Sequence, residues 1–193
     1  ISGIAVSNLG HSHPAVVKAI KEQAANYTHL MVYGEYIQSP QVKFAKKICD
    51  QLPAALNSVY FVNSGSEAVE GALKLAKRYT GRIEIVSFKN AYHGSTHGAL
   101  SVMGDEALKQ PFRPLLPGIR ILPYNDESQL KHITHKTACI IIEPIQGEAG
   151  TIVPAKKYIQ ALRKRCNETG TLLIFDEIQT GFGRTGKLFT FKH

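Results

Sequence analysis

The sequence lacks the features that mark membrane-spanning and secreted proteins. No apolar run approaches the roughly 20 residues that a membrane-spanning helix needs. The first ten residues, ISGIAVSNLG, have neither the basic start nor the long apolar stretch of a signal peptide. They also lack an initiator Met, so we expect the chain to be a piece of a longer protein. We predict no membrane partner.

Cysteine is scarce as well. The chain has three cysteines, and they lie far apart in the sequence. Because the number is odd and the spacing wide, neither a disulfide framework nor a zinc site follows from them. A reducing, cytoplasmic setting is therefore the expected location.

Two histidine pairs have a spacing that would suit metal ligands. They are His11 with His13 and His93 with His97. Neither pair is accompanied by a third ligand or by the Glu of an H-E-x-x-H pattern. We therefore predict no metal site.

The formal net charge of +8 would suit either a nucleic acid or an anionic small molecule. However, the Lys and Arg residues are scattered along predicted helix faces, and no basic run is interleaved with aromatic residues. The charge pattern favours solvated helix faces and no nucleic-acid partner.

The chain alternates between short apolar runs and segments of helical period. Its 193 residues, 44% of them hydrophobic, suffice for the core of one domain or for most of a larger one. Each run is apolar throughout, as strands are when helices cover both faces of a sheet. The predicted strands are Ser58–Val62, Ile83–Phe88, Ile119–Leu122, Cys139–Ile142 and Leu172–Phe175. The predicted helices begin at Pro14 and Pro40 and span about Glu67–Tyr79, Gly98–Met103 and Ala155–Asn167. This order predicts an α/β fold, in which ligands bind at the carboxyl ends of the strands.

A candidate phosphate site follows the first predicted strand. Ser64 and Glu67 have the spacing of a capping box, which marks the start of a helix. Gly65 would let backbone N–H groups approach a ligand closely, and Ser66 would add a hydroxyl at the positive end of the helix. Two interpretations stay open, a site for one phosphate and an ordinary capped helix.

The other strand ends carry an aromatic residue and three acids. Tyr92 precedes His-Gly in a loop and could stack on a planar ring. Glu143 and Glu148 flank a loop shaped by Pro and Gly. Asp176 ends an apolar strand, where a carboxylate stays ionised only beside a cation or a strong donor. A metal, an Arg and a protonated ring nitrogen would each meet that need.

An NTPase is the first alternative, because Gly181-x-x-x-x-Gly186-Lys187 resembles a phosphate-binding loop. That loop requires Ser or Thr after the Lys to hold Mg²⁺, and Leu188 stands there. It should also follow its own strand, but it follows the strand that carries Asp176 without a helical crossover. Pyridoxal 5′-phosphate (PLP) fits better, because it has one phosphate, a planar ring and a ring nitrogen that needs a carboxylate.

The sequence also resembles a known family, the class III PLP-dependent aminotransferases. Those include the acetylornithine, ornithine and 4-aminobutyrate enzymes, and the resemblance covers essentially the whole chain in order. The matching motifs are Asn63-Ser-Gly-Ser-Glu-Ala-Val-Glu70, Tyr92-His-Gly94, Pro123-Tyr-Asn-Asp126, Glu143-Pro-Ile-Gln-Gly-Glu148 and Asp176-Glu-Ile-Gln-Thr-Gly-Phe-Gly-Arg-Thr-Gly186. The last two are highly specific.

The resemblance implies a cofactor site. Gly65 and Ser66 would hold the phosphate, and Tyr92 would stack on one face of the ring with His93 beside it. Ile178 would press on the opposite face.

The resemblance also implies the polar contacts. Asp176 would pair with the pyridine nitrogen, and Gln179 would donate to the phenolic oxygen of the ring. Glu148 would be the gating carboxylate that moves to accommodate the substrate carboxylate. The Gly-rich stretch 181–186 would then be a structural turn.

Two departures from the family pattern concern the substrate and the nucleophile. Ser95 stands where ornithine- and acetylornithine-type members have an Arg for a substrate carboxylate. The Schiff-base lysine of the family lies roughly thirty residues past the Asp, and so beyond His193. Lys187 and Lys192 are too close to that Asp and lie in the wrong motif.

By resemblance the fold is a fold-type-I large domain, with a mostly parallel, mixed sheet and helices on both faces. We expect residues 1–45 to lead into this domain and residues 46–193 to form it, without its C-terminal end and without the small domain. The implied enzyme is a homodimer that moves an amino group from an ω- or α-amino donor to a 2-oxo acid such as 2-oxoglutarate. An aminomutase, a decarboxylating transaminase and a catalytically inactive fragment remain alternatives, and Tyr33 and Tyr36 are candidates for choosing the substrate.

Overall fold

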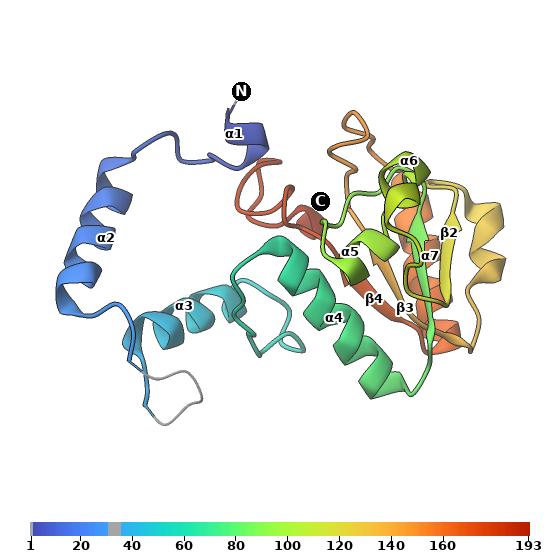
Figure 1. Ribbon diagram of the computed structural model, residues 1–193, viewed down its shortest axis with the longest axis horizontal. Helices are drawn as coiled ribbons and strands as arrows, with labels where there is room; N and C mark the ends of the chain where they lie inside the picture. The colour runs from blue at the N-terminus through green and yellow to red at the C-terminus, as the bar shows by residue number, and fades with distance from the viewer. Residues whose placement is uncertain (1, 31–35) are drawn as a thin grey trace. The chain divides into compact units, whose positions relative to one another are not determined.

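The computed structural model describes residues 2–30 and 36–193. The chain divides into two compact units, residues 1–61 and residues 62–193 (Figure 1). The predicted boundary after residue 45 falls inside the first unit. Which residues belong to the cofactor-binding domain therefore stays a prediction.

The first unit is helical. Its helices are α1 (Ser2–Ala5), α2 (Pro14–Asn26) and α3 (Ser39–Cys49). The predicted helix starts at Pro14 and near Pro40 are confirmed. Proline suits the first turn of a helix because its φ is already helical and because the N–H that it lacks would have no acceptor there. In α2 and α3, whose residues are all described, none is buried.

The prediction of a strand at Ser58–Val62 is wrong. These five residues are all described, and they form neither a helix nor a strand. The ring of Phe61 stacks on that of Phe44 in α3, with 5.8 Å between the centroids, and Tyr60 is 82% exposed. An apolar run of this composition becomes a strand only where a neighbouring strand can pair with it, which a local pattern does not reveal.

The second unit contains a four-stranded sheet. Its strands are β1 (Glu84–Phe88), β2 (Ile119–Leu122), β3 (Thr137–Ile142) and β4 (Leu172–Phe175), in the order β2-β1-β3-β4. Every pairing between these described strands is parallel, with Phe88 opposite Leu122 and Ile142 opposite Phe175. The carboxyl ends of all four strands therefore lie at one edge of the sheet.

Helices cover both faces of this sheet. The longer ones are α4 (Gly65–Thr80) and α7 (Lys156–Thr169), and the short ones are α5 (His97–Ser101) and α6 (Glu106–Lys109). Three 3₁₀ turns, Gln110–Phe112, Glu127–His132 and Thr190–Lys192, complete the unit.

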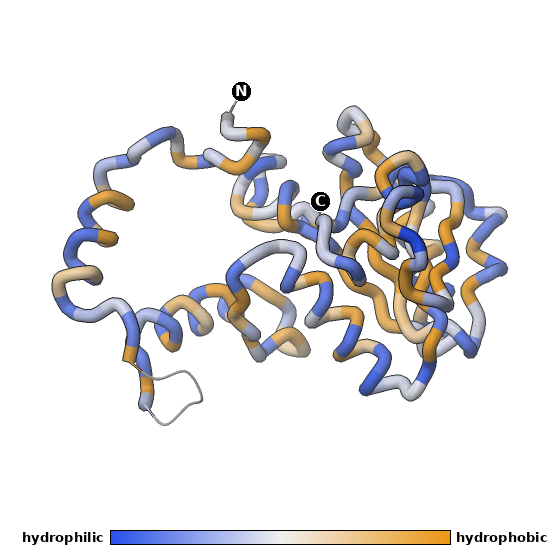
Figure 2. The backbone as a smooth tube through the Cα atoms, viewed as in Figure 1, coloured by the Kyte–Doolittle hydropathy of each residue, from blue (hydrophilic) through white to orange (hydrophobic). Residues whose placement is uncertain are grey.

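Alternate strand residues point into two separate apolar clusters. Ile140 and Ile142 of β3 pack in one cluster with Leu162 of α7, whereas Cys139 and Ile141 lie in the other, which also contains residues of α4 and α5. In Figure 2 the tube is largely orange where the strands run, and it alternates between orange and blue along the helices. The predicted α/β fold with helices on both faces is confirmed.

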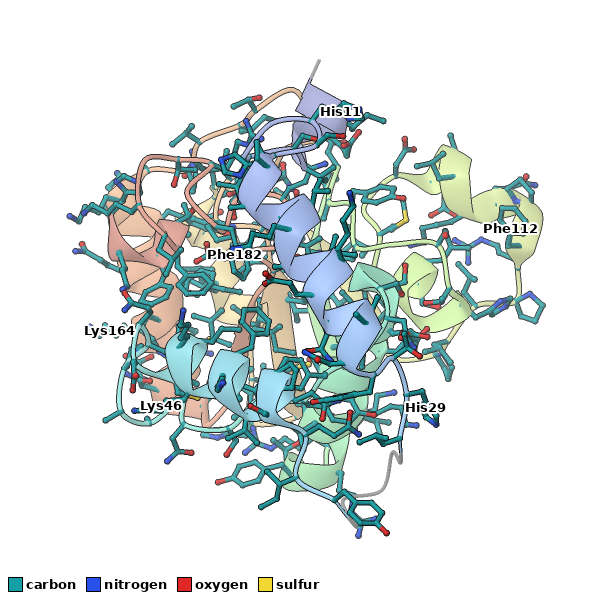
Figure 3. The ribbon with its side chains drawn as sticks, turned by 90° about the vertical axis from the view of Figure 1, so that its left-hand side faces the viewer. His11, His29, Lys46, Phe112, Lys164 and Phe182 are labelled. Atoms are coloured by element: carbon teal, nitrogen blue, oxygen red, sulfur yellow. The ribbon has the colours of Figure 1, made fainter. Side chains whose placement is uncertain are left out.

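Basic side chains lie on the exposed faces of the helices. Lys46 on α3 has 75% of its side chain exposed and Lys164 on α7 has 80% (Figure 3). Both form ion pairs one helical turn along, with Asp50 and Glu168. Within the part of the chain that is described, no helix has the length and apolarity to cross a membrane.

Candidate active site

The candidate site is built at the edge where the strands end. The loop after β1 carries Tyr92, the loop after β3 carries Glu148, and the segment after β4 begins with Asp176. Parallel pairing places these three connections side by side. The start of α4 is the fourth component.

The start of α4 is capped by Ser64 as the sequence predicted, whereas Glu67 reaches back to Asn63, the residue before the cap. The N–H of Glu67 donates to Oγ of Ser64 at 3.2 Å, and the N–H of Asn63 donates to Oε2 of Glu67 at 2.6 Å. The first N–H groups of a helix have no acceptor within the helix, and the helix dipole adds partial positive charge there. An anion at Gly65 and Ser66 would be favoured by the start of the 16-residue α4, and such a site stays a prediction.

The loop after β1 packs closely on this helix start. Gly94 has a φ of +116°, and a Cβ on it would lie 2.2 Å from Oγ of Ser66. The N–H of Ser95 donates to the same hydroxyl at 3.2 Å. Only a glycine permits both this backbone conformation and this close approach.

The segment after β4 reaches the same helix start. A Cβ on Gly65 would lie 3.0 Å from Cδ1 of Ile178, so these two residues are neighbours. Ile178 is 53% exposed, and Tyr92, on the loop after β1, is 42% exposed. Two apolar side chains are thus accessible at this edge of the sheet.

A buried hydrogen bond between two side chains joins the two segments. Nδ1 of His93 lies 2.7 Å from Oδ2 of Asp176, and their side chains are 0% and 5% exposed. Oδ1 of Asp176 accepts the N–H of Ile178 at 3.1 Å. Because an ionised carboxylate can only accept hydrogen bonds, this contact would require the proton of the imidazole on Nδ1. Nε2 of His93 is buried and has no hydrogen-bond partner among the described residues.

Two glutamates of the segment after β3, Glu143 and Glu148, form hydrogen bonds that hold this loop in place. Glu143 is buried; Oε1 accepts the N–H of Tyr92 at 2.9 Å, and Oε2 accepts the N–H of Gly147 at 3.1 Å. Burial raises the pKa of its carboxyl above the usual range, although the two N–H donors oppose that shift. Glu148 accepts a short hydrogen bond from Nε2 of Gln179. The loop is thus linked to both neighbouring segments.

The structure therefore brings together all the residues that the sequence singled out for a cofactor. It also shows two that the sequence did not assign, Glu143 and Glu70. Oε1 of Glu70 accepts bonds from Oγ1 of Thr96 and the N–H of Gly98, both at 2.7 Å, and so holds the start of α5. A Glu-Pro pair at the end of a strand was the available signal for Glu143, whereas the signal for Glu70 was its place at the end of the motif 63–70.

The Gly-rich stretch 181–186 forms a turn that is closed by side chains nearby. The carboxylate of Glu177 accepts the N–H groups of Thr190 and Phe191, and Nζ of Lys187 donates to the carbonyl of Lys192 at 2.6 Å. Phe182, labelled in Figure 3, packs edge-on against Phe189. Lys187 is therefore engaged within the turn itself.

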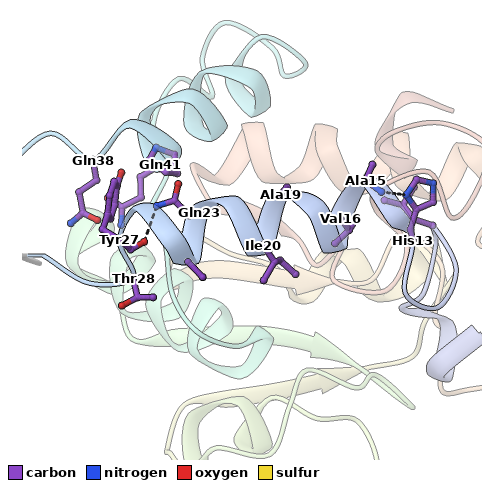
Figure 4. Close-up of a pocket in the computed structure, with 13 residues that line it drawn as sticks. His13, Ala15, Val16, Ala19, Ile20, Gln23, Tyr27, Thr28, Gln38 and Gln41 are labelled. Carbon is purple, nitrogen blue, oxygen red and sulfur yellow. Dashed lines mark hydrogen bonds between the residues drawn. The ribbon is translucent and has the colours of Figure 1, made fainter.

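The first unit contains a separate apolar groove of about 770 Å³ along α2 and the start of α3 (Figure 4). His13 borders it, and its Nδ1 accepts the N–H of Ala15 at 3.3 Å and caps α2. No group of three or more His, Cys, Asp or Glu residues that could hold a metal occurs among residues 2–30 and 36–193. Tyr33 lies outside the described residues, and Tyr36 is 64% exposed.

Comparisons with known proteins identify the family of this chain. The family profile described as aminotransferase class-III matches residues 1–193. An acetylornithine aminotransferase of Methanopyrus kandleri is 44% identical over 100% of the chain, which covers 49% of that protein. A [LysW]-aminoadipate semialdehyde/glutamate semialdehyde transaminase of Sulfolobus acidocaldarius is 42% identical, with the same coverage of both chains.

Solved structures give the same result. The ornithine aminotransferase of Toxoplasma gondii superposes with a TM-score of 0.86 at 32% identity, over 100% of this chain and 47% of that one. That structure is described as having partial occupancy of PLP at its active site. The chain spans about half the length of the curated relatives that it matches. With the match of the family profile over its whole length, the chain belongs to the class III aminotransferases.

Proposed function

We propose that the protein containing this chain is a PLP-dependent aminotransferase. It would move an amino group from an ω- or α-amino donor, of the acetylornithine, ornithine or 4-aminobutyrate kind, to a 2-oxo acid such as 2-oxoglutarate. The names of the relatives, which include acetylornithine and semialdehyde substrates, support this class of donor. One observation carries the proposal: the buried carboxylate of Asp176, held by His93 beside the start of α4.

The residues present fit the cofactor. Gly65 and Ser66 offer a helix start for a single phosphate, and Asp176 offers a buried negative charge for a protonated ring nitrogen. Because His93 and the N–H of Ile178 hold both oxygens of Asp176, the carboxylate is oriented before any ligand binds. PLP, when bound, supplies an electron sink, and a carboxylate at its ring nitrogen strengthens that property.

The remaining roles follow from exposure and position. Tyr92 and Ile178 would contact the two faces of the ring, and both side chains are accessible. Gln179 would donate to the phenolic oxygen. Its present bond to Glu148 would place the proposed gating carboxylate next to that donor. We propose that Glu148 moves away when a substrate carboxylate has to bind.

The nucleophile and the assembly belong to the same proposal. Lys187 is engaged with the carbonyl of Lys192, so we assign it no catalytic role and propose that the Schiff-base lysine lies outside these 193 residues. We also propose a cytoplasmic homodimer. Ser95 occupies the place of the carboxylate-binding Arg of some members, so another residue would bind that group.

The test uses the protein that contains these residues. Titration with PLP should give a saturable visible absorption band, and a panel of amino donors with 2-oxoglutarate should yield glutamate from at least one donor. Asp176→Asn should lower kcat by about 10²–10³-fold, because it removes a preorganised charge. Asp50→Asn, which changes an exposed carboxylate on the first unit, is the matched control. Near-normal turnover in Asp176→Asn would refute the assignment of the ring-nitrogen partner. Product formed without any 2-oxo acid would instead point to an aminomutase.

A further inference from the structure

Glu143 is a buried carboxylate to which the proposed function gives no role. It is 6% exposed and lies at the carboxyl end of β3, directly before Pro144. Charged groups are seldom buried unless they are paired or fully hydrogen-bonded. Its partners therefore indicate what it does.

Those partners are backbone N–H groups of two different loops. Oε1 accepts from Tyr92, whose ring is the proposed stacking partner, and Oε2 accepts from Gly147, which precedes the proposed gate Glu148. Gln146 adds a parallel link, because its Nε2 donates to the carbonyl of Lys89 at 2.9 Å. The loops after β1 and β3 are thus joined at two points, and one of them is charged.

The backbone of Glu143 is fixed as well. The hydroxyl of Tyr124, in the loop after β2, donates to the carbonyl oxygen of Glu143 at 3.0 Å. The ring of Tyr124 packs edge-on against Phe88 and Tyr158 in the core. The carboxylate therefore projects from a residue whose backbone is held in place. Its hydrogen bonds in turn fix the positions of the two N–H groups that donate to it.

We propose that Glu143 is a positioning residue, which ties the Tyr92 loop to the Gly147–Glu148 loop so that the stacking ring and the gate keep one relative geometry. This inference rests on the proposed function. A side chain of this length with two acceptor oxygens is required, because an amide has one acceptor and would turn its own N–H₂ toward the second N–H group. Asp keeps the charge but is one methylene shorter, so it cannot reach both loops from the same backbone position.

The two substitutions separate position from charge. Glu143→Gln removes the carboxylate as well as one acceptor oxygen. Glu143→Asp keeps the charge and removes only the reach. If Glu143 acted through its charge alone, the Asp variant would behave as the wild type.

The first measurement needs no cofactor. In the cofactor-free protein that contains these residues, amide hydrogen exchange at Tyr92 or Gly147 should accelerate by roughly 10-fold or more in both variants, because a charge-assisted bond is lost. The amide of Lys89, which donates to the carbonyl of Leu122 at 2.8 Å, is the internal control and should not change. Glu127→Gln, an exposed carboxylate paired with a lysine, is the matched control variant.

The second measurement uses the PLP-loaded protein. Both Glu143 variants should lower kcat by roughly 10- to 100-fold with a smaller change in KM, because a displacement of about 1 Å misaligns reacting groups. The visible circular dichroism of the bound cofactor should change in sign or amplitude, which a loss of stability alone would not produce. Glu127→Gln should retain the wild-type values.

The outcomes distinguish the two proposals. Unchanged exchange at both Tyr92 and Gly147 in Glu143→Asp would overturn the inference, whatever the protein binds. A wild-type protein that fails to bind PLP would refute the proposed function, and the exchange result would still decide the link between the loops. If Glu143→Gln also loses protection at Lys89, its fold has failed, and the exchange rates of Glu143→Asp then decide the inference.

Discussion

Replacing Gly94 by Ala should separate the loop after β1 from the start of α4. The backbone φ of +116° is a conformation that side chains other than glycine rarely adopt, and imposing it costs about 1–3 kcal/mol. The new Cβ would also lie 2.2 Å from Oγ, 3.0 Å from Cβ and 3.1 Å from Cα of Ser66. Rotation of the hydroxyl relieves only the first contact, so the backbone has to move, at about 1–3 kcal/mol more. The free energy of unfolding should fall by roughly 2–6 kcal/mol.

Gly65→Ala is the matched control. Its new Cβ would meet only side-chain atoms of Ile178, at 3.0–3.5 Å, and that half-exposed side chain can turn away. Alanine also favours a helix over glycine by up to about 1 kcal/mol. Urea unfolding followed by far-UV circular dichroism should therefore place Gly65→Ala within about 1 kcal/mol of the wild type. Equal stability of the two variants would refute this account of the contact between the loop and the helix.

Two further predictions concern buried groups. His93→Ala removes one of the two hydrogen-bond partners of the buried Asp176 carboxylate and should lower the free energy of unfolding by about 1–3 kcal/mol; a loss below about 0.5 kcal/mol in urea unfolding would contradict the pairing. Burial raises the pKa of Cys139 to about 12 and that of Cys166 to about 11, so the reactive thiolate is at most roughly one part in a thousand at pH 8. Peptide-level mass spectrometry after thiol labelling of the native protein should find Cys49 modified well before the other two, and equal labelling would contradict the buried placement.

Much of the sheet could be predicted from the sequence. The runs that became β1 to β4 are mostly apolar, and β3 is buried throughout, as a parallel sheet with helices on each face requires; the edge strand β2 carries the exposed Arg120. The run Ser58–Val62 has the same composition and is not a strand, because pairing depends on a neighbour that local sequence does not specify. The four-residue helix Glu106–Lys109 was not predicted, since it is too short to show a helical period.

The site could be predicted in part. Asp176 was found because an acid at the end of an apolar strand demands a partner. That this partner is His93, 83 residues earlier in the chain, follows only from the fold. Glu143 was noticed but given no role, because it binds backbone N–H groups, which no pattern of side chains records.

The absence of buried residues in α2 and α3 has a consequence for the order of folding. Isolated helices of this length are marginal in water, and with no buried residue neither of these two is stabilised by an apolar core. Residues 62–193 contain both apolar clusters and can nucleate cooperatively. Residues 1–61 nevertheless emerge from the ribosome before residues 62–193. Val16 and Ile20 of α2 would therefore be exposed while residues 62–193 are still being synthesised. During that time this stretch would be a natural binding site for chaperones.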